Sequence, residues 1–144
     1  MRVAAAVIVV QVFAHPEFER ISVTAHKWLP YEVVRDDPLA IGTYLRAMRA
    51  DGWTIVALEQ SAHSVPLQSF RFPSKVVLLL GREKEGVPVE LLNDVVDATV
   101  EIPQFGIIRS LNVHVSASMI IWEYTRQRLV AQAQAADGAI ALDG

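Results

Sequence analysis

Ser110 and Asn112 are the polar residues whose positions first suggest a ligand site. They flank Leu111 in IPQFGIIRSLNVHVSASMIIWEY, where a short strand is expected to pass through a glycine-containing loop into a long helix. The first N–H groups of a helix have no partner within it. Ser110 is therefore a credible N-cap, and the Asn112 amide can donate to or accept from a ligand. Taken alone, the stretch is more typical of a capped core helix.

A second candidate loop lies in LLLGREKEGVP. Gly81 and Gly86 bracket four charged residues directly after an apolar run, and glycine lets a ligand approach the backbone closely. The spacing matches neither the Walker phosphate loop nor the dinucleotide fingerprint G-x-G-x-x-G. On its own, this stretch is more typical of an ordinary strand-to-helix turn with exposed charges.

These loops need a scaffold, and hydrophobic periodicity predicts one. We expect strands at residues 7–13, 53–59, 75–80 and 98–103, with helices that begin at Pro38, Pro88 and Ser110. Alternating strands and helices indicate an α/β fold with a largely parallel sheet. Ligands in such sheets bind outside the carboxyl ends of the strands. The loops EQSAHS, GREKEG and PQFGIIRS all fall at such ends.

The helix boundaries have local signals. Asp37 is expected to cap the first helix and Gly52 to end it. The last helix is expected to continue to about Gln134. The residues expected in apolar stripes are Leu39, Ile41, Leu45 and Met48 in the first helix, and Leu111, Val115, Met119 and Trp122 in the last.

Composition narrows the class of protein. The 144 residues are 52% apolar and 20% charged, which suits one domain with a substantial core. There is no cysteine, so disulfides and thiolate sites are excluded. The formal charge of −3 argues against tight autonomous nucleic-acid binding but leaves room for a local basic patch. The histidines, which do not cluster at metal-ligand spacing, are His15, His26, His63 and His114.

The apolar start MRVAAAVIVVQVFA loosely mimics a secretory signal. We interpret it instead as a buried strand, because Gln11 and Phe13 crowd the supposed cleavage region. No apolar run approaches the roughly 20 residues that a membrane span needs. We therefore expect a protein that is neither secreted nor in the membrane.

Considered together, LLLGREKEGVP and IPQFGIIRSLNVHVSASMIIWEY resemble motifs two and three of the SpoU branch of the SPOUT RNA methyltransferases. RSLNVHVS followed by IWEYTRQ is most similar to the eukaryotic tRNA guanosine-18 ribose methyltransferases of the TAR RNA-binding protein 1 type. VTAHKWLP and WTIVALEQ fit the same group, so the resemblance covers residues 7–129. It implies an S-adenosylmethionine-dependent enzyme that methylates a ribose 2′-hydroxyl, at guanosine 18 of tRNA.

The resemblance also implies an architecture. We expect a mostly parallel sheet flanked by helices, with a deep trefoil knot near the carboxyl end, over residues 1–134. Residues 135–144 would form a flexible tail. The family further implies a homodimer through the C-terminal helix, a cytoplasmic or nuclear location and no need for a metal.

Site residues follow from the motif positions. Glu83, Ser110 and Asn112 would shape the active site, with Glu83 orienting the group that receives the hydroxyl proton and Asn112 positioning the ribose. Residues expected to line the S-adenosylmethionine pocket are Glu59, Gln60, Leu80, Gly81, Ile102 and Leu111. Arg82, Lys84 and Arg109 would contact RNA phosphates, or else would be solvated loop charges.

One family motif is absent. The sequence contains no N-x-G-x-x-x-R, the motif-one pattern whose arginine is the family's proposed activator of the 2′-hydroxyl. We expect the family's first strand and helix to be missing, and part of the stripe Val115, Met119 and Trp122 to be exposed as a result. Two alternatives therefore stay open: a non-catalytic cofactor-binding or dimerisation module, and an unrelated α/β domain with a fortuitous glycine loop.

Overall fold

The sheet organises the molecule. The computed structural model describes residues 4–9, 28, 32–82, 84–107 and 110–140. Within these ranges, five parallel strands lie in the order β1-β4-β2-β5-β3. Their bounds are Ala4–Val9 for β1, Thr54–Leu58 for β2, Val65–Pro66 for β3, Lys75–Leu80 for β4 and Ala98–Glu101 for β5. The predicted parallel α/β class is confirmed.

β4 is an interior strand of this sheet. Val76 to Leu80 are each at most 1% exposed, and β4 pairs with β1 on one side and β2 on the other. A strand buried on both faces has no reason to alternate apolar and polar residues, so its sequence reads as the continuous run KVVLLL. The first strand was expected at residues 7–13; β1 ends at Val9, and residues 10–13 lie outside the described ranges.

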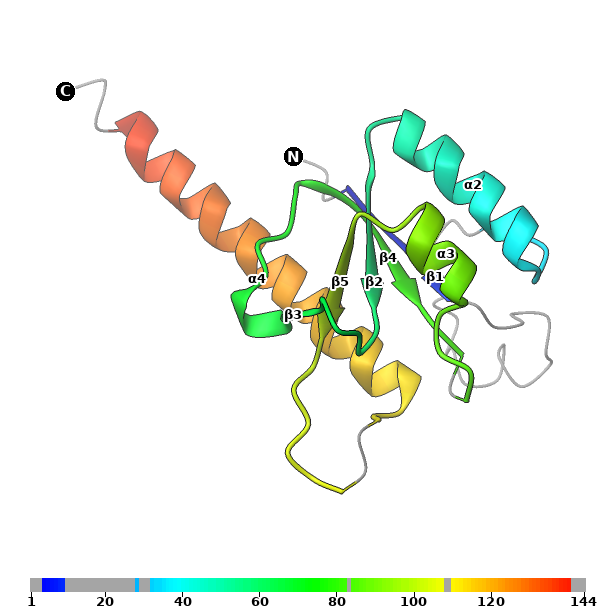
Figure 1. Ribbon diagram of the computed structural model, residues 1–144. Helices are drawn as coiled ribbons and strands as arrows, with labels where there is room; N and C mark the ends of the chain where they lie inside the picture. The colour runs from blue at the N-terminus through cyan, green and yellow to red at the C-terminus, as the bar shows by residue number, and fades with distance from the viewer. Residues whose placement is uncertain (1–3, 10–27, 29–31, 83, 108–109, 141–144) are drawn as a thin grey trace.

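Helices cover both faces of the sheet (Figure 1). α2 (Pro38–Ala50) and α3 (Val89–Asp94) lie over one face, and α4 (Val113–Ile140) crosses the other. A single 3₁₀ turn, η2 (Leu67–Ser69), follows β3. The apolar core accordingly has two parts, one beneath α2 and α3 and one beneath α4. No helix in the described ranges has both the length and the apolarity needed to cross a bilayer.

α2 begins and ends at the predicted signals. The Asp37 carboxylate accepts a hydrogen bond from the Ala40 N–H at 2.8 Å, and the helix stops just before Asp51 and Gly52. Ile41 and Leu45 are buried, but Leu39 is 70% exposed, so its place in the apolar stripe was wrong. Two residues turn a helix by about 200°, which puts Leu39 opposite Ile41.

The cap of α4 lies two residues later than expected. The Asn112 carbonyl accepts the first helical bond, from Ser116 N–H at 3.0 Å, and Asn112 Oδ1 accepts from His114 N–H at 2.9 Å. Asn112 is therefore the cap, and the prediction that Ser110 caps the helix was wrong. The helix also continues to Ile140, past the expected end near Gln134.

The buried stripe of α4 also differs from the prediction. Ile120 and Tyr124 are at most 1% exposed, and partly buried Val113 and Ala117 pack beside them. The predicted stripe is not the buried one: Val115 is 49%, Met119 39% and Trp122 65% exposed, and Leu111, which precedes the helix, is 38% exposed. The Tyr124 hydroxyl donates to the Ser74 carbonyl at 2.8 Å, which fixes the helix in this register.

Candidate functional site

A cavity of about 520 Å³ opens at the carboxyl ends of β2, β4 and β5. Drug-sized ligands occupy cavities of roughly 300–1,000 Å³. All six residues expected to line a cofactor pocket do line this cavity: Glu59, Gln60, Leu80, Gly81, Ile102 and Leu111. They come from three segments far apart in the sequence, and the parallel sheet brings these segments to one edge. The cavity thus lies at the strand ends where a ligand site was expected.

The 81–87 loop forms one wall of the cavity. Arg82 N–H donates to the Gly86 carbonyl at 3.0 Å and Gly86 N–H donates to the Arg82 carbonyl at 2.9 Å, which closes a tight turn. Gly86 has a φ of +69°, a conformation that glycine adopts without steric cost. A Cβ at Gly81 would lie 2.2 Å from the Gly86 carbonyl carbon. The two predicted glycines therefore make the turn possible.

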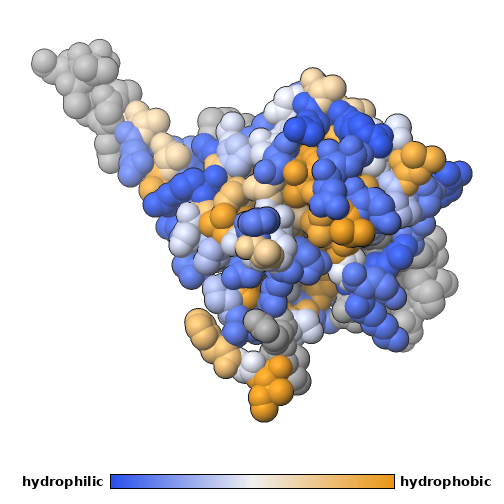
Figure 2. Space-filling model, in the orientation of Figure 1, coloured by the Kyte–Doolittle hydropathy of each residue, from blue (hydrophilic) through white to orange (hydrophobic). Residues whose placement is uncertain are grey.

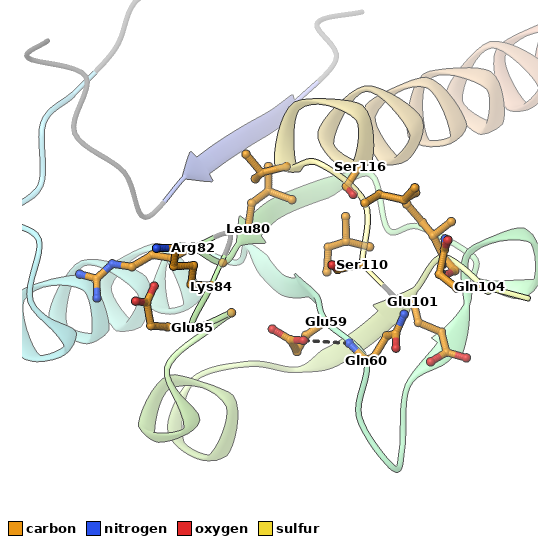
Figure 3. A pocket seen from close by; sticks show the side chains of 16 residues that line it. Glu59, Gln60, Leu80, Arg82, Lys84, Glu85, Glu101, Gln104, Ser110 and Ser116 are labelled. Atoms are coloured by element: carbon orange, nitrogen blue, oxygen red, sulfur yellow. Dashed lines mark hydrogen bonds between the residues drawn. The ribbon is translucent and has the colours of Figure 1, made fainter. Parts of the chain in front are cut away.

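Glu59 connects this loop to β2. Its carboxylate accepts hydrogen bonds from Val87 N–H at 2.9 Å and from Gln60 N–H at 3.1 Å. Figure 3 shows Glu59 and Gln60 side by side at the floor of the cavity. The prediction placed Glu59 near the ligand but contained no signal for the bond to Val87, which lies 28 residues further along the chain.

Glu101 and Gln104 lie at the opposite end of the cavity from the 81–87 loop (Figure 3). Glu101 ends β5, and its carboxylate lies 2.7 Å from the Ser64 hydroxyl, so the β2–β3 loop is tied to β5 here. Sequence reasoning missed both residues. Both lie at the carboxyl end of a predicted strand, and that position could have identified them as candidate site residues.

The two polar residues of the Ser-Leu-Asn triplet have different surroundings. Ser110 lines the cavity together with Ser116, whereas Asn112 is not among the described lining residues. Asn112 holds the start of α4 instead, through the capping bonds given above. Its predicted role of positioning the ribose therefore stays a prediction.

Two of the three predicted RNA contacts lie at the end of the cavity formed by the 81–87 loop. Lys84 and Arg82 both line the cavity. The Arg82 guanidinium is 2.6 Å from the Asp36 carboxylate, with both side chains 39% exposed, so part of its charge is neutralised by a residue that the sequence did not connect with the loop. Glu83 and Arg109 lie outside the described residues. In the described part of the chain, no three acidic, histidine or cysteine side chains gather to hold a metal ion.

Comparisons with known proteins place the chain in a family. Residues 1–122 match the model of the SpoU rRNA Methylase family. The mouse tRNA (guanosine(18)-2′-O)-methyltransferase TARBP1 is 49% identical over 133 residues, which are 90% of this chain and 8% of that protein. The tRNA (guanosine(18)-2′-O)-methyltransferase of Saccharomyces cerevisiae is 39% identical over 83% of this chain, again 8% of its own length. The chain thus spans a small fraction of these two relatives.

Two solved structures are similar over most of the chain. The A. aeolicus TrmH/SpoU tRNA modifying enzyme aligns with a TM-score of 0.72 at 30% identity, over 90% of this chain and 64% of that one. The SpoU methyltransferase AviRb from Streptomyces viridochromogenes, in complex with the cofactor AdoMet, aligns with a TM-score of 0.72 at 27% identity, over 88% of this chain and 50% of that one.

Proposed function

This chain belongs to the SpoU rRNA methylase family, and from that premise we propose that it is an S-adenosylmethionine-dependent methyltransferase domain acting on a ribose 2′-hydroxyl of tRNA. The observation that carries the proposal is the cavity at the strand ends, which gathers Leu80 and Gly81 from motif two, Ile102 and Leu111 from motif three, and Glu59 and Gln60 from the end of the preceding strand. Guanosine 18 is the proposed position, in keeping with the names of the mouse and yeast relatives.

The cavity lining fits S-adenosylmethionine. Leu58, Leu80, Ile102 and Leu111 offer apolar surface for an adenine ring. Gly81 contributes backbone to the lining, and an adenosine without phosphate groups needs no lysine clamp. When bound, the cofactor supplies a methyl group activated by its sulfonium.

The remaining lining residues suit an RNA acceptor. Lys84 can neutralise a phosphate, and Arg82 can do so if the phosphate competes with Asp36. Arg109 is proposed as the third RNA contact and Glu83 as the residue that orients the proton acceptor, both from the family resemblance. Ser110 lies where it can hydrogen-bond the acceptor ribose, because it lines the same cavity. A positioned group that takes the hydroxyl proton contributes about 10²–10⁴-fold to such a reaction.

A second function has a specific observation in its favour. The sequence contains no N-x-G-x-x-x-R motif, so the arginine that the family uses to activate the hydroxyl is not in these 144 residues. A domain that binds S-adenosylmethionine without transferring its methyl group would fit that absence.

The family resemblance supports three further proposals. The first is that the 102–112 loop and α4 form a deep trefoil knot. The second is that the protein is a homodimer through α4, supported by the exposed apolar side chains Val115, Met119 and Trp122. A cytoplasmic or nuclear location is proposed for a tRNA-modifying domain. The flexible tail expected at residues 135–144 was wrong for residues 135–140, which belong to α4.

Two assays separate the functions. Transfer of labelled methyl from S-adenosylmethionine to unmodified tRNA is measured for the chain alone and for the chain joined to the motif-one segment of the mouse relative. Calorimetry with S-adenosylhomocysteine measures binding without chemistry. Transfer by either protein supports the first function. Binding with no transfer by either supports the second, and absence of binding overturns both.

A further inference from the structure

The carboxylate of Glu59 is held by hydrogen bonds from two backbone N–H groups. Its two oxygens accept from Val87 N–H at 2.9 Å and from Gln60 N–H at 3.1 Å. Val87 is 5% exposed and belongs to the core beneath α2 and α3. Water therefore cannot easily replace the carboxylate as the partner of the Val87 amide, and a buried amide without a partner is costly.

The backbone of Glu59 is itself held in place. Glu59 N–H donates to the Val100 carbonyl of β5 at 3.0 Å, directly after β2 ends. Glu59 is thus fixed to the β5 side of the sheet, while its carboxylate reaches the loop that follows β4. The residue connects the two sides of the cavity floor, independently of any bond within the loop.

The loop is fitted closely around this carboxylate. A Cβ at Gly86 would lie 2.4 Å from Glu59 Oε2, a distance that real Cβ atoms do not show. The neighbouring turn is equally tight, because a Cβ at Gly81 would meet the Gly86 and Val87 backbone. The path of the 81–87 loop and the position of the Glu59 carboxylate therefore determine each other.

We propose that Glu59 is a positioning residue: its carboxylate holds the 81–87 loop in the shape that binds the cofactor. Each of its two oxygens already accepts a hydrogen bond from a backbone amide, and its effect on S-adenosylmethionine passes through the loop. This inference rests on the proposed function for the identity of the ligand, but the hold on the loop does not. Glutamine is not an equivalent, because one of its two terminal atoms is a donor and would face an amide N–H.

Hydrogen exchange of the ligand-free protein tests the hold directly. In Glu59→Gln we expect the Val87 amide to exchange at least about tenfold faster, because its acceptor is weakened or lost. Glu90→Gln, an exposed change on α3, is the matched control and should leave that rate unchanged. Unchanged exchange at Val87 in Glu59→Gln would overturn the inference.

Calorimetry with S-adenosylhomocysteine tests the consequence. Glu59→Gln should weaken binding about ten- to hundredfold, as loss of a charge-assisted bond predicts, while Glu90→Gln binds as the unsubstituted chain does. If the unsubstituted chain fails to bind, the proposed function fails, and the exchange result still decides the hold on the loop. If Glu59→Gln binds within twofold of the unsubstituted chain, only the inference fails.

A double-mutant cycle separates the close fit from general damage. Gly86→Ala should weaken S-adenosylhomocysteine binding strongly when Glu59 is present, since the added methyl meets the carboxylate. In a Glu59→Ala background the collision is gone, and the same change should cost at least about fivefold less. Equal losses in the two backgrounds would show that Glu59 and Gly86 are not coupled, which contradicts the inference.

Discussion

The two loops that wall the cavity are built in different ways. The 81–87 loop is closed by paired bonds between Arg82 and Gly86 and anchored to Glu59. In the 102–112 loop, Gln104 Nε2 donates to the Ile102 carbonyl at 3.3 Å and the Asn112 bonds hold its end. Figure 2 shows apolar surface at its projecting tip, where Phe105 is 99% and Ile107 101% exposed. One wall is preformed by backbone bonds, and the other leaves its apolar tip exposed.

Because the two loops are built differently, we expect them to respond differently to substitution. A preformed wall fails when its backbone is displaced, and the ligand site fails with it. A wall with an exposed tip tolerates changes at the tip, because little packing is lost there. Four substitutions test this difference, in order of decreasing expected effect.

The largest effect is expected at Gly81. Gly81→Ala places a methyl carbon 2.2 Å from the Gly86 carbonyl carbon, so the loop must move. We expect at least about a hundredfold loss of S-adenosylhomocysteine affinity in calorimetry, in line with backbone strain of a few kcal/mol. The control is Gly52→Asn, distant from the cavity, where no atom lies within 4 Å of an added Cβ and asparagine tolerates the φ of +82°. Affinity retained in Gly81→Ala would show that the wall is not preformed.

The start of α4 supports the other wall. Asn112→Ala removes the acceptor for His114 N–H and should lower the free energy of unfolding by about 1 kcal/mol. Asn112→Asp retains an acceptor oxygen and should stay close to the unsubstituted chain. Urea denaturation measures both. Equal stability of all three proteins would mean that the cap contributes nothing.

Acid should weaken α4 through Glu123. Hydrogen bonding from Arg126 lowers the pKa of Glu123 to about 2, against burial, which raises it; Gln127 adds a further bond. Because the folded pKa lies below the ordinary value near 4.5, this stabilisation is full above pH 4.5 and is lost as the pH falls toward 2. Glu123→Gln should cost about 0.5–1 kcal/mol at pH 7 and flatten the fall of Tm between pH 4.5 and 2. An unchanged acid profile would contradict the assignment.

The smallest effect on stability is expected at the exposed tip. Phe105→Ala should change the free energy of unfolding by less than about 0.5 kcal/mol and leave S-adenosylhomocysteine affinity within about twofold. Phe72→Ala is the informative contrast, since Phe72 is 7% exposed and packs edge-on against Tyr124; it should cost about 3–5 kcal/mol. A large loss in Phe105→Ala would show that the tip packs against something in solution.

Local signals in the sequence predicted much of the fold. The run KVVLLL has the bounds of β4, and Asp37 caps α2 as its chemistry indicates. The stripe of α4 was wrong because both Val115–Met119–Trp122 and Val113–Ala117–Ile120–Tyr124 fit a helical period, and only the packing against the sheet selects one. β3 was missed because Val65–Pro66 is too short to carry a periodic signal.

The cavity was predicted where strand ends and family motifs coincide, as at Gly81 and Ile102. The sequence did not predict the hydrogen bond between Glu59 and Val87 or the ion pair between Arg82 and Asp36. Each joins residues brought together only by the folded sheet, and no spacing along the chain encodes them.

The central claim is that the cavity between these two walls binds S-adenosylmethionine. Mapping backbone chemical shifts by NMR during titration with S-adenosylhomocysteine tests it most directly. We predict saturable shifts concentrated at the amides of Leu80, Gly81 and Ile102, with none of comparable size on α2. Shifts concentrated on α2, or no saturable shift at all, would show that the ligand does not bind in this cavity.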